Sequence, residues 1–246
     1  MHRVNKKSGF SWILSGLLLI AAALLLITYN LWNEATAAAS SNIALQQMLA
    51  ILKNNGVLSE QSADATTASG QAIDSGQTTV PGNTGSPADS SLTDVTASLP
   101  DYYLNPEMEM PTTEIDGRDY IGFLDIPSLE LSLPIISRWS YPDLKVSPCR
   151  YAGSAYLDNL VIAAHNYRTH FGYIKNLRPG DKLTFTDVDG NIFYYEVADI
   201  EILKPTDTQK MVSGDYALTL FTCTYGGQSR ITVGCEVEDS ASLLHK

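Results

Sequence analysis

The chain has 246 residues, 44% of them hydrophobic, which is enough for one ordinary domain with appendages. Its formal net charge of −11 excludes the nucleic-acid-binding class, because no basic patch is available to meet phosphates. The three cysteines, Cys149, Cys223 and Cys235, form neither a metal-binding spacing nor a disulfide framework. For Cys149 and Cys235 the open alternatives are a bridge and a pair of small buried thiols.

The N-terminal region predicts a membrane anchor. Residues 1–9 contain three basic side chains and precede an apolar run over residues 10–32. About 20 helical residues cross a hydrocarbon core of ~30 Å. No positive charge follows until Lys53, so we expect a single-pass signal anchor with a cytoplasmic N-terminus and an extracellular remainder. The alternative is a cleaved signal peptide, since Ala35-Thr36-Ala37 resembles a cleavage site; the long apolar run favours the uncleaved anchor.

Two connecting segments follow the apolar run. Residues 33–53 are Ala-rich with scattered large apolar residues, and we expect a helix that is either a plain stalk or a short self-association stripe. Residues 54–117 form an acidic segment rich in Ser, Thr, Gly and Ala. Such a composition buries too little apolar surface to offset its ordering entropy, which predicts a disordered linker. From Pro100 onward the linker has two further interpretations, a packing arm or a lid.

The folded domain is expected over residues 118–240, with residues 241–246 as a tail. Several short strands with turn signals and few helices indicate a compact β-barrel. Leu160–Asn166 is apolar almost throughout, which is typical of a strand covered on both faces. The predicted strands are Tyr120–Pro127, Leu131–Ser137, Leu160–Asn166, Lys182–Thr186, Asn191–Ile202 and the two runs of a final hairpin.

The final hairpin spans Ala217–Glu238, with YGGQS as its turn. Side chains alternate between the faces of a strand. If Cys223 lies opposite Arg230, one face is apolar and points inward; its members are Leu218, Leu220, Val233 and Cys235. The other face then places a thiol beside a guanidinium.

A cysteine beside an arginine has a chemical use. A positive charge favours the reactive thiolate, and the same cation stabilises an oxyanion formed on a carbonyl. The missing general acid/base is best supplied by a histidine. Of the four histidines, His165 ends the apolar run LVIAAHN, where it is well placed to meet a cysteine at the end of another strand. His170 is expected at the rim or surface, and a zinc site of His165, His170 and a cysteine lacks the required spacing.

These motifs resemble the sortases, the cysteine transpeptidases of Gram-positive cell surfaces. TLFTC over Thr219–Cys223 fits their TLxTC signature, an arginine begins the next strand, and an upstream strand ends in histidine. The likeness covers residues 120–238. His165–Asn166 and YIGFLDIP look closest to class B, whereas the short loop after Cys223 and the missing helical insertion depart from it, so the class is left open.

The resemblance implies a fold and a site. The expected fold is mostly β, an eight-stranded sortase-type barrel with short helices, preceded by the transmembrane helix and the disordered linker. The implied catalytic set is Cys223, His165 and Arg230, and Thr222 and Asn166 are candidate substrate-binding residues. Thr222 has the alternative of capping the strand end, and Asn166 that of orienting His165 or lying on a loop.

The implied function is cleavage of a C-terminal sorting motif, LPxTG-like or NPxTN-like, through a cysteine thioester. The acyl group then passes to an amine of a cell-wall precursor or a pilin. Two alternatives stay open: a hydrolytic cysteine endopeptidase that trims surface proteins, and a non-catalytic wall-associated binding module. We expect no cofactor or metal. Calcium, which some sortases use, is left open, and the sequence shows no clear calcium loop. The expected partners are surface proteins with a sorting motif, the amine nucleophile and the membrane.

Overall fold

The computed structural model describes residues 6–54, 56, 99–213 and 215–238. Its strands are β1 (Thr113–Ile115), β2 (Arg118–Ile126), β3 (Leu131–Ile136), β4 (Cys149–Ala152), β5 (Leu160–Ala164), β6 (Lys182–Asp187), β7 (Ile192–Leu203), β8 (Leu218–Cys223) and β9 (Arg230–Val237). Its α-helices are α1 (Lys6–Asn54), α3 (Asp101–Leu104), α4 (Tyr141–Leu144) and α5 (Thr208–Met211), and three 3₁₀ turns lie at Pro127–Leu129, Ala155–Leu157 and Ile174–Asn176.

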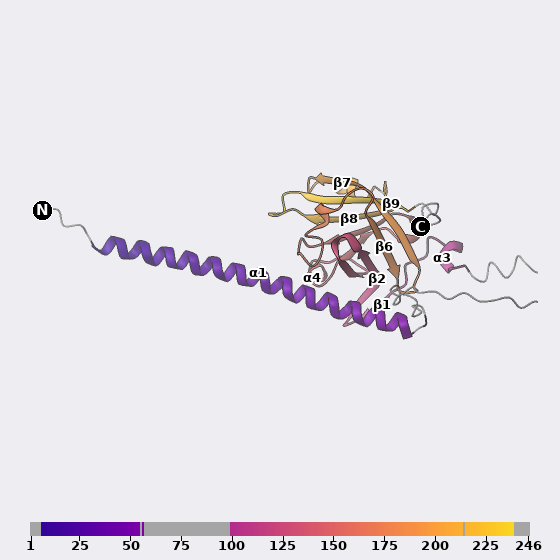
Figure 1. Cartoon of the computed structure of the whole chain (residues 1–246), viewed down its shortest axis with the longest axis horizontal. Coiled ribbons are helices and arrows are strands. Elements are labelled where there is room, and N and C mark those ends of the chain that lie inside the picture. The colour runs from indigo at the N-terminus through magenta and orange to yellow at the C-terminus, as the bar shows by residue number, and fades with distance from the viewer. Residues whose placement is uncertain (1–5, 55, 57–98, 214, 239–246) are drawn as a thin grey trace, which may run out of the picture.

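The strands close into a barrel. The nine-stranded sheet has the order β1-β2-β3-β4-β5-β8-β9-β7-β6, and β2 also pairs with β6, so β1 is left at the edge while the other eight strands form a ring (Figure 1). The predicted architecture, mostly β with an eight-stranded barrel and few short helices, is confirmed. Strands β1 and β4, which have only three and four residues, were not predicted.

Gly122 is required where the ring closes between β2 and β6. It lies opposite Asp187 on β6 and adopts φ +151°, and a Cβ there would lie 2.0 Å from the carbonyl oxygen of Thr186. Any side chain would therefore push the two strands apart. Inside the ring the core is formed by fully buried side chains that include Leu124, Ile135, Leu160, Ile162, Phe171, Phe185 and Tyr195.

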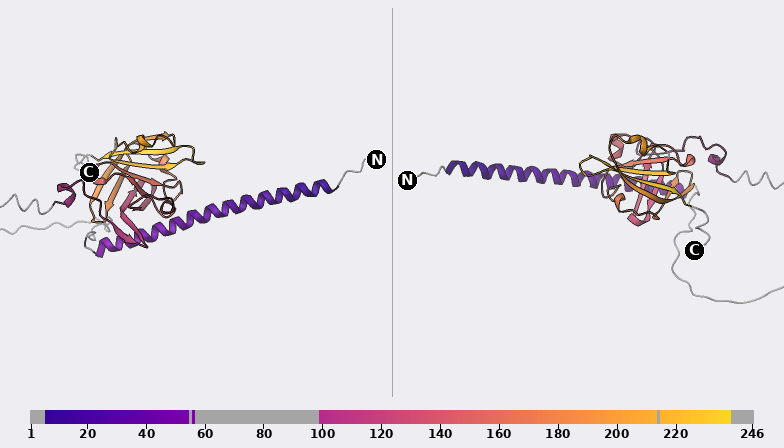
Figure 2. Two further views of the ribbon diagram at one scale, coloured as in Figure 1. Left: turned by 180° about the vertical axis from the view of Figure 1, so that it is seen from behind. Right: turned by 90° about the horizontal axis from the view of Figure 1, so that it is seen from above.

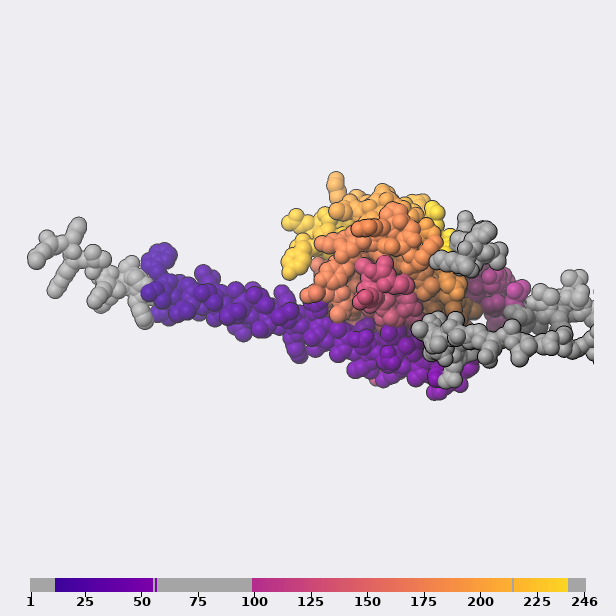
Figure 3. Space-filling model, viewed as in Figure 1, coloured from indigo at the N-terminus to yellow at the C-terminus, as the bar shows by residue number. Residues whose placement is uncertain are grey.

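Helix α1 has two halves with different surroundings. Figure 3 shows its N-terminal half standing clear of the barrel, and its C-terminal half lying along it. In the C-terminal half the buried residues recur at helical spacing: Ala37, Ser41, Ala44, Leu45, Met48 and Leu52. They pack against Ile115, Tyr120, Phe123, Ile136 and neighbours on the outside of the sheet. The C-terminal half of α1 therefore packs on the barrel, which differs from both expectations, a plain stalk and a self-association stripe.

The structure describes the segment before the barrel from residue 99 onward. The predicted linker covers residues 54–117, and its residues 55 and 57–98 lie outside the described residues. From residue 99 onward the chain is folded: Tyr102 of α3 stacks on Tyr156 with ring centroids 4.5 Å apart, and Met110 is buried in the core. Folded structure therefore begins before residue 118, because these apolar side chains cover one end of the barrel. This is the packing-arm interpretation.

Candidate active site

The β8–β9 hairpin has the predicted register. Cys223 pairs with Arg230, the last residue of β8 opposite the first of β9. The predicted inward face is confirmed, since its four members are buried at 0% exposure: Leu218, Leu220, Val233 and Cys235. The alternation of apolar and polar residues fixes this register, because a one-residue slip would turn the apolar set outward. Cys223 itself is half-buried.

His165 reaches the same edge through a parallel pair of strands. In that pair Ala164 of β5 lies opposite Thr222 of β8, and the Thr222 hydroxyl donates to the Ala164 carbonyl oxygen at 2.8 Å. One residue further along each strand come His165 and Cys223. The three neighbouring strands β5, β8 and β9 thereby bring the three predicted catalytic residues to one edge of the sheet, where adjacent strands are about 4.8 Å apart.

The loop after His165 is tightly wound. The His165 carbonyl oxygen accepts from Phe171 N at 3.2 Å, and the Tyr167 carbonyl oxygen accepts from Gly172 N at 2.8 Å. A Cβ on Gly172 would lie 2.7 Å from the carbonyl oxygens of Asn166 and Tyr167, so this close approach needs glycine. The His165 ring lies 4.9 Å from the Tyr167 ring. Burial, and secondly Lys145, lowers the pKa of His165 and so favours its neutral form.

Arg230 is held by the turn of its own hairpin. Its Nη1 donates to the carbonyl oxygens of Gly227 at 3.0 Å and Ser229 at 3.1 Å. The turn is closed by Thr224, whose N–H donates to the Ser229 carbonyl oxygen at 2.9 Å and whose hydroxyl accepts from Ser229 N at 3.1 Å. These bonds hold Nη1 of the guanidinium against the turn, and the backbone of Arg230 lies opposite that of Cys223. An arginine has five N–H donors, so donors beyond those of Nη1 remain for a substrate.

A groove of about 550 Å³ opens beside Cys223. Its walls include Cys223, Thr222 and Asn166, and they do not include His165 or Arg230. Thr222 is 1% exposed, and its hydroxyl donates to the Ala164 carbonyl oxygen. Both observations favour the strand-end role of Thr222 over a substrate contact. The other lining residues were not predicted; they are Arg168, Gly172, Tyr173, Lys175, Ile200, Ile202, Thr224, Tyr225 and Ile231. No motif marks them, because they meet only when β7 folds across β9.

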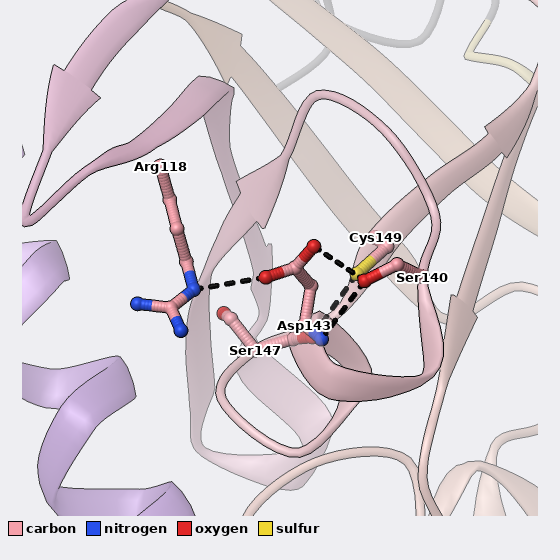
Figure 4. Close-up of polar contacts among 5 residues, drawn as sticks. All are labelled: Arg118, Ser140, Asp143, Ser147 and Cys149. Atoms are coloured by element: carbon pink, nitrogen blue, oxygen red, sulfur yellow. Dashed lines mark hydrogen bonds and ion pairs between the residues drawn. The ribbon is translucent and has the colours of Figure 1, made fainter.

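The other two cysteines are buried free thiols, which settles the alternatives in favour of no bridge. Cys149 Sγ donates to the Ser147 carbonyl oxygen at 3.5 Å, and burial raises the pKa of Cys149 to about 12. Figure 4 shows the polar contacts beside it, where Arg118 Nε donates to Asp143 Oδ1 at 2.9 Å and Ser140 caps α4. Burial also raises the pKa of Cys235. Thiols with raised pKa values are poor nucleophiles.

His170 was expected at the rim or surface, and that prediction is wrong. It is 0% exposed, because the loop after His165 turns inward and buries His170 together with Phe171. In the part of the chain that the structure describes, neither ring nitrogen has a hydrogen-bond partner. Burial, and then His165, lowers the pKa of His170 to about 4. Among the same described residues, His, Cys, Asp and Glu form no group of three or more that could hold a metal ion.

Comparisons with known proteins relate the chain to one family. The family model described as the sortase domain matches residues 124–238. The chain is similar to sortase A from Corynebacterium diphtheriae, with 23% identity and a TM-score of 0.44. The matched region covers 50% of this chain and 62% of that sortase, so this chain spans less than two thirds of the length of that sortase. It is also similar to sortase C from Clostridium perfringens SM101, with 23% identity, a TM-score of 0.45 and coverage of 60% and 96%.

A third similar structure is the sortase D5 transpeptidase of Clostridium perfringens, with 24% identity, a TM-score of 0.45 and coverage of 56% and 87%. No curated protein sequence matches the chain. These structures carry the class names A, C and D, and the class of this chain stays open. At residues 124–238 this chain carries a domain of the sortase family.

Proposed function

We propose that the chain is a membrane-anchored cysteine transpeptidase that cleaves a sorting motif and transfers the acyl part to an amine. The observation that carries this proposal is the convergence of Cys223, His165 and Arg230 at the ends of three adjacent strands. It rests on two registers, Ala164 opposite Thr222 and Cys223 opposite Arg230. A nucleophile, a base and a fixed cation at one edge are the parts that acyl transfer needs.

The first half of the reaction forms a thioester. Neutral His165, the form that its lowered pKa favours, takes the proton of the Cys223 thiol as sulfur attacks the substrate carbonyl carbon. The carbon–sulfur bond forms and negative charge moves to the carbonyl oxygen, which Arg230 stabilises. The carbon–nitrogen bond then breaks, and protonated His165 gives its proton to the departing amine.

The second half releases the product. An incoming amine nitrogen attacks the thioester carbon while His165 accepts the amine proton. The carbon–sulfur bond breaks, the sulfur leaves with its electron pair, and the proton held by His165 returns to it. Water in place of the amine would give hydrolysis by the same route, so the acceptor decides between a transpeptidase and an endopeptidase.

The test is mass spectrometry of the protein incubated with LPxTG-like and NPxTN-like peptides. A structure to which this chain is similar, sortase C of Clostridium perfringens, was determined with the C-terminal cell wall sorting motif (23% identity), so peptides of this kind are the first to try. We expect a covalent adduct on Cys223 and, with an added amine acceptor, a ligated product. An unlabelled Cys223 would contradict the proposal and favour the non-catalytic binding module, and cleavage without ligation would favour the endopeptidase.

We propose further that α1 crosses the membrane with its N-terminus in the cytoplasm. The described part of the chain contains one helix long and apolar enough to do so. Its apolar side chains lie exposed, for example Trp12 at 77%, Leu18 at 72% and Leu25 at 70%. The helix continues unbroken through Ala35–Ala37, and Ala37 is buried against the barrel, which supports an uncleaved anchor. Resistance of the full chain to carbonate extraction from membranes tests this proposal.

A further inference from the structure

The membrane boundary on α1 can be located from burial. Large exposed apolar residues run from Trp12 to Trp32, and the first buried residue of the docked half is Ala37. The change from exposed apolar residues to buried ones occurs around Glu34, which carries the first carboxylate of the helix. A membrane-spanning segment of about 20 residues that ends at Trp32 fills a hydrocarbon core of ~30 Å. Glu34 then lies in the headgroup layer.

The loop that carries His165 lies at this same level. The backbone N–H of Arg168 donates to Glu34 Oε1 at 2.7 Å, across 134 positions of sequence. Burial, and secondly Tyr29 and Glu34 of α1, raises the pKa of Tyr167 in this loop. Arg168 also lines the groove beside Cys223. The groove therefore opens within a few residues of the place where α1 leaves the barrel for the bilayer.

The barrel is oriented consistently with this contact. In Figures 1 and 2 the loop between β8 and β9 extends from the barrel toward the N-terminal half of α1 in every view, and α3 lies at the other end. Tyr225 in this loop is 99% exposed, and Ile202 of β7, on the groove wall, is 72% exposed. Tyr173, Arg168 and Lys175 also line the groove and are exposed. Aromatic and basic side chains beside an apolar one suit the headgroup layer of an anionic bilayer.

We infer that the groove rim, defined as Arg168, Tyr173, Lys175, Ile202 and Tyr225, rests on the phospholipid headgroups of the bilayer that α1 spans. This inference rests on the membrane attachment proposed above. The packing of the second half of α1 against the sheet holds the barrel in that orientation, and Glu34 acts as a positioning residue for the loop. A peptide that enters the groove must then lie at the bilayer surface, which selects membrane-tethered chains over freely diffusing ones.

Site-specific fluorescence in liposomes tests the orientation. The full chain carrying Cys223→Ala is used, because Cys149 and Cys235 are 0% exposed and will not take a label. Single cysteines replace Tyr225 or Ile202 at the rim, or Ile192 at the barrel end beside α3 as the matched control, 46% exposed. Each is labelled with an environment-sensitive fluorophore. The vesicles contain phosphatidylglycerol and phosphatidylethanolamine with a nitroxide on a fraction of the headgroups.

We expect at least threefold stronger quenching at positions 225 and 202 than at position 192. Equal quenching at all three positions, or none at either rim position in a chain that resists carbonate extraction, would overturn this inference and leave the membrane attachment intact. A chain that carbonate removes would overturn the attachment and the inference together. Cross-linking of a rim cysteine to a second copy, without quenching, would overturn the inference in favour of a protein partner.

The Glu34 contact is tested in the same assay. Glu34→Ala removes the acceptor for Arg168 N–H, and we expect quenching at position 225 to fall at least twofold relative to position 192. Glu34→Gln keeps an acceptor oxygen and should restore it. Unchanged quenching in Glu34→Ala would overturn the positioning role of Glu34 and leave the rim contact supported by the first experiment.

Discussion

The two buried clusters, inside the barrel and between α1 and the sheet, contain the same residue types as the sheet edge beside the groove, in different surroundings. Cys149 and Cys235 are buried with raised pKa values, whereas Cys223 is half-buried at a strand end. His170 is fully buried, whereas His165, five positions before it, is half-buried at the edge. Solvent access and neighbouring groups, and not residue type, therefore separate structural thiols and imidazoles from those available for chemistry.

Replacing Cys223 or Cys149 by alanine gives the largest expected contrast between these regions. Cys223→Ala should lower transpeptidation of a sorting-motif peptide by at least about 10³-fold, because the nucleophile is gone. Cys149→Ala is the matched control and should stay within about threefold of the parent in kcat/KM, because a buried neutral thiol takes no part. A Cys223→Ala protein that still forms the covalent adduct, or an inactive yet folded Cys149→Ala protein, would reverse the two assignments.

The histidines offer the next contrast. His165→Gln should reduce the rate of acyl-enzyme formation by about 10²–10⁴-fold, since proton transfer to the leaving amine is lost. His170→Gln removes the buried ring five residues away and should leave that rate within about tenfold. Stopped reactions resolved by mass spectrometry measure both rates. If the two variants lose activity equally, the loop acts as a unit and the specific role of His165 is contradicted.

Arg230→Lys tests whether the fixed cation matters through its shape. A lysine ammonium cannot donate to the Gly227 and Ser229 carbonyls and to a substrate oxygen in the same fixed directions. We expect kcat to fall by about 10²-fold, the cost of losing one oxyanion donor. Arg138→Lys, on an exposed residue, is the control and should leave kcat unchanged. Full activity of Arg230→Lys would show that charge alone suffices.

The sequence predicted the edge of the sheet better than its surroundings. Alternation along Leu218–Cys223 and Arg230–Val237 was enough to pair Cys223 with Arg230, because only one register buries the apolar set. The apolar run before His165 likewise marked a central strand. The groove walls were not predictable, since Ile202 and Tyr173 reach the groove through pairings between distant strands. The docking of α1 was missed as well, because an amphipathic stripe does not name the surface that it covers.

His170 is the clearest failure of sequence reasoning, and it yields the smallest predicted effect, on stability. Its pKa is about 4 in the folded protein and 6.5 when unfolded, so the folded state is favoured most above pH 6.5 and loses stability as pH falls toward 4. At pH 4.5 this loss amounts to roughly 2–3 kcal/mol. His170→Leu lacks the titrating group, so the difference in unfolding free energy between pH 7.5 and 4.5 should be smaller in the variant by about that amount. Urea titrations of both proteins at the two pH values measure it. If the unfolding free energies of the two proteins changed with pH by the same amount, His170 would be protonated as readily in the folded state as in the unfolded state. That result would contradict the lowered pKa.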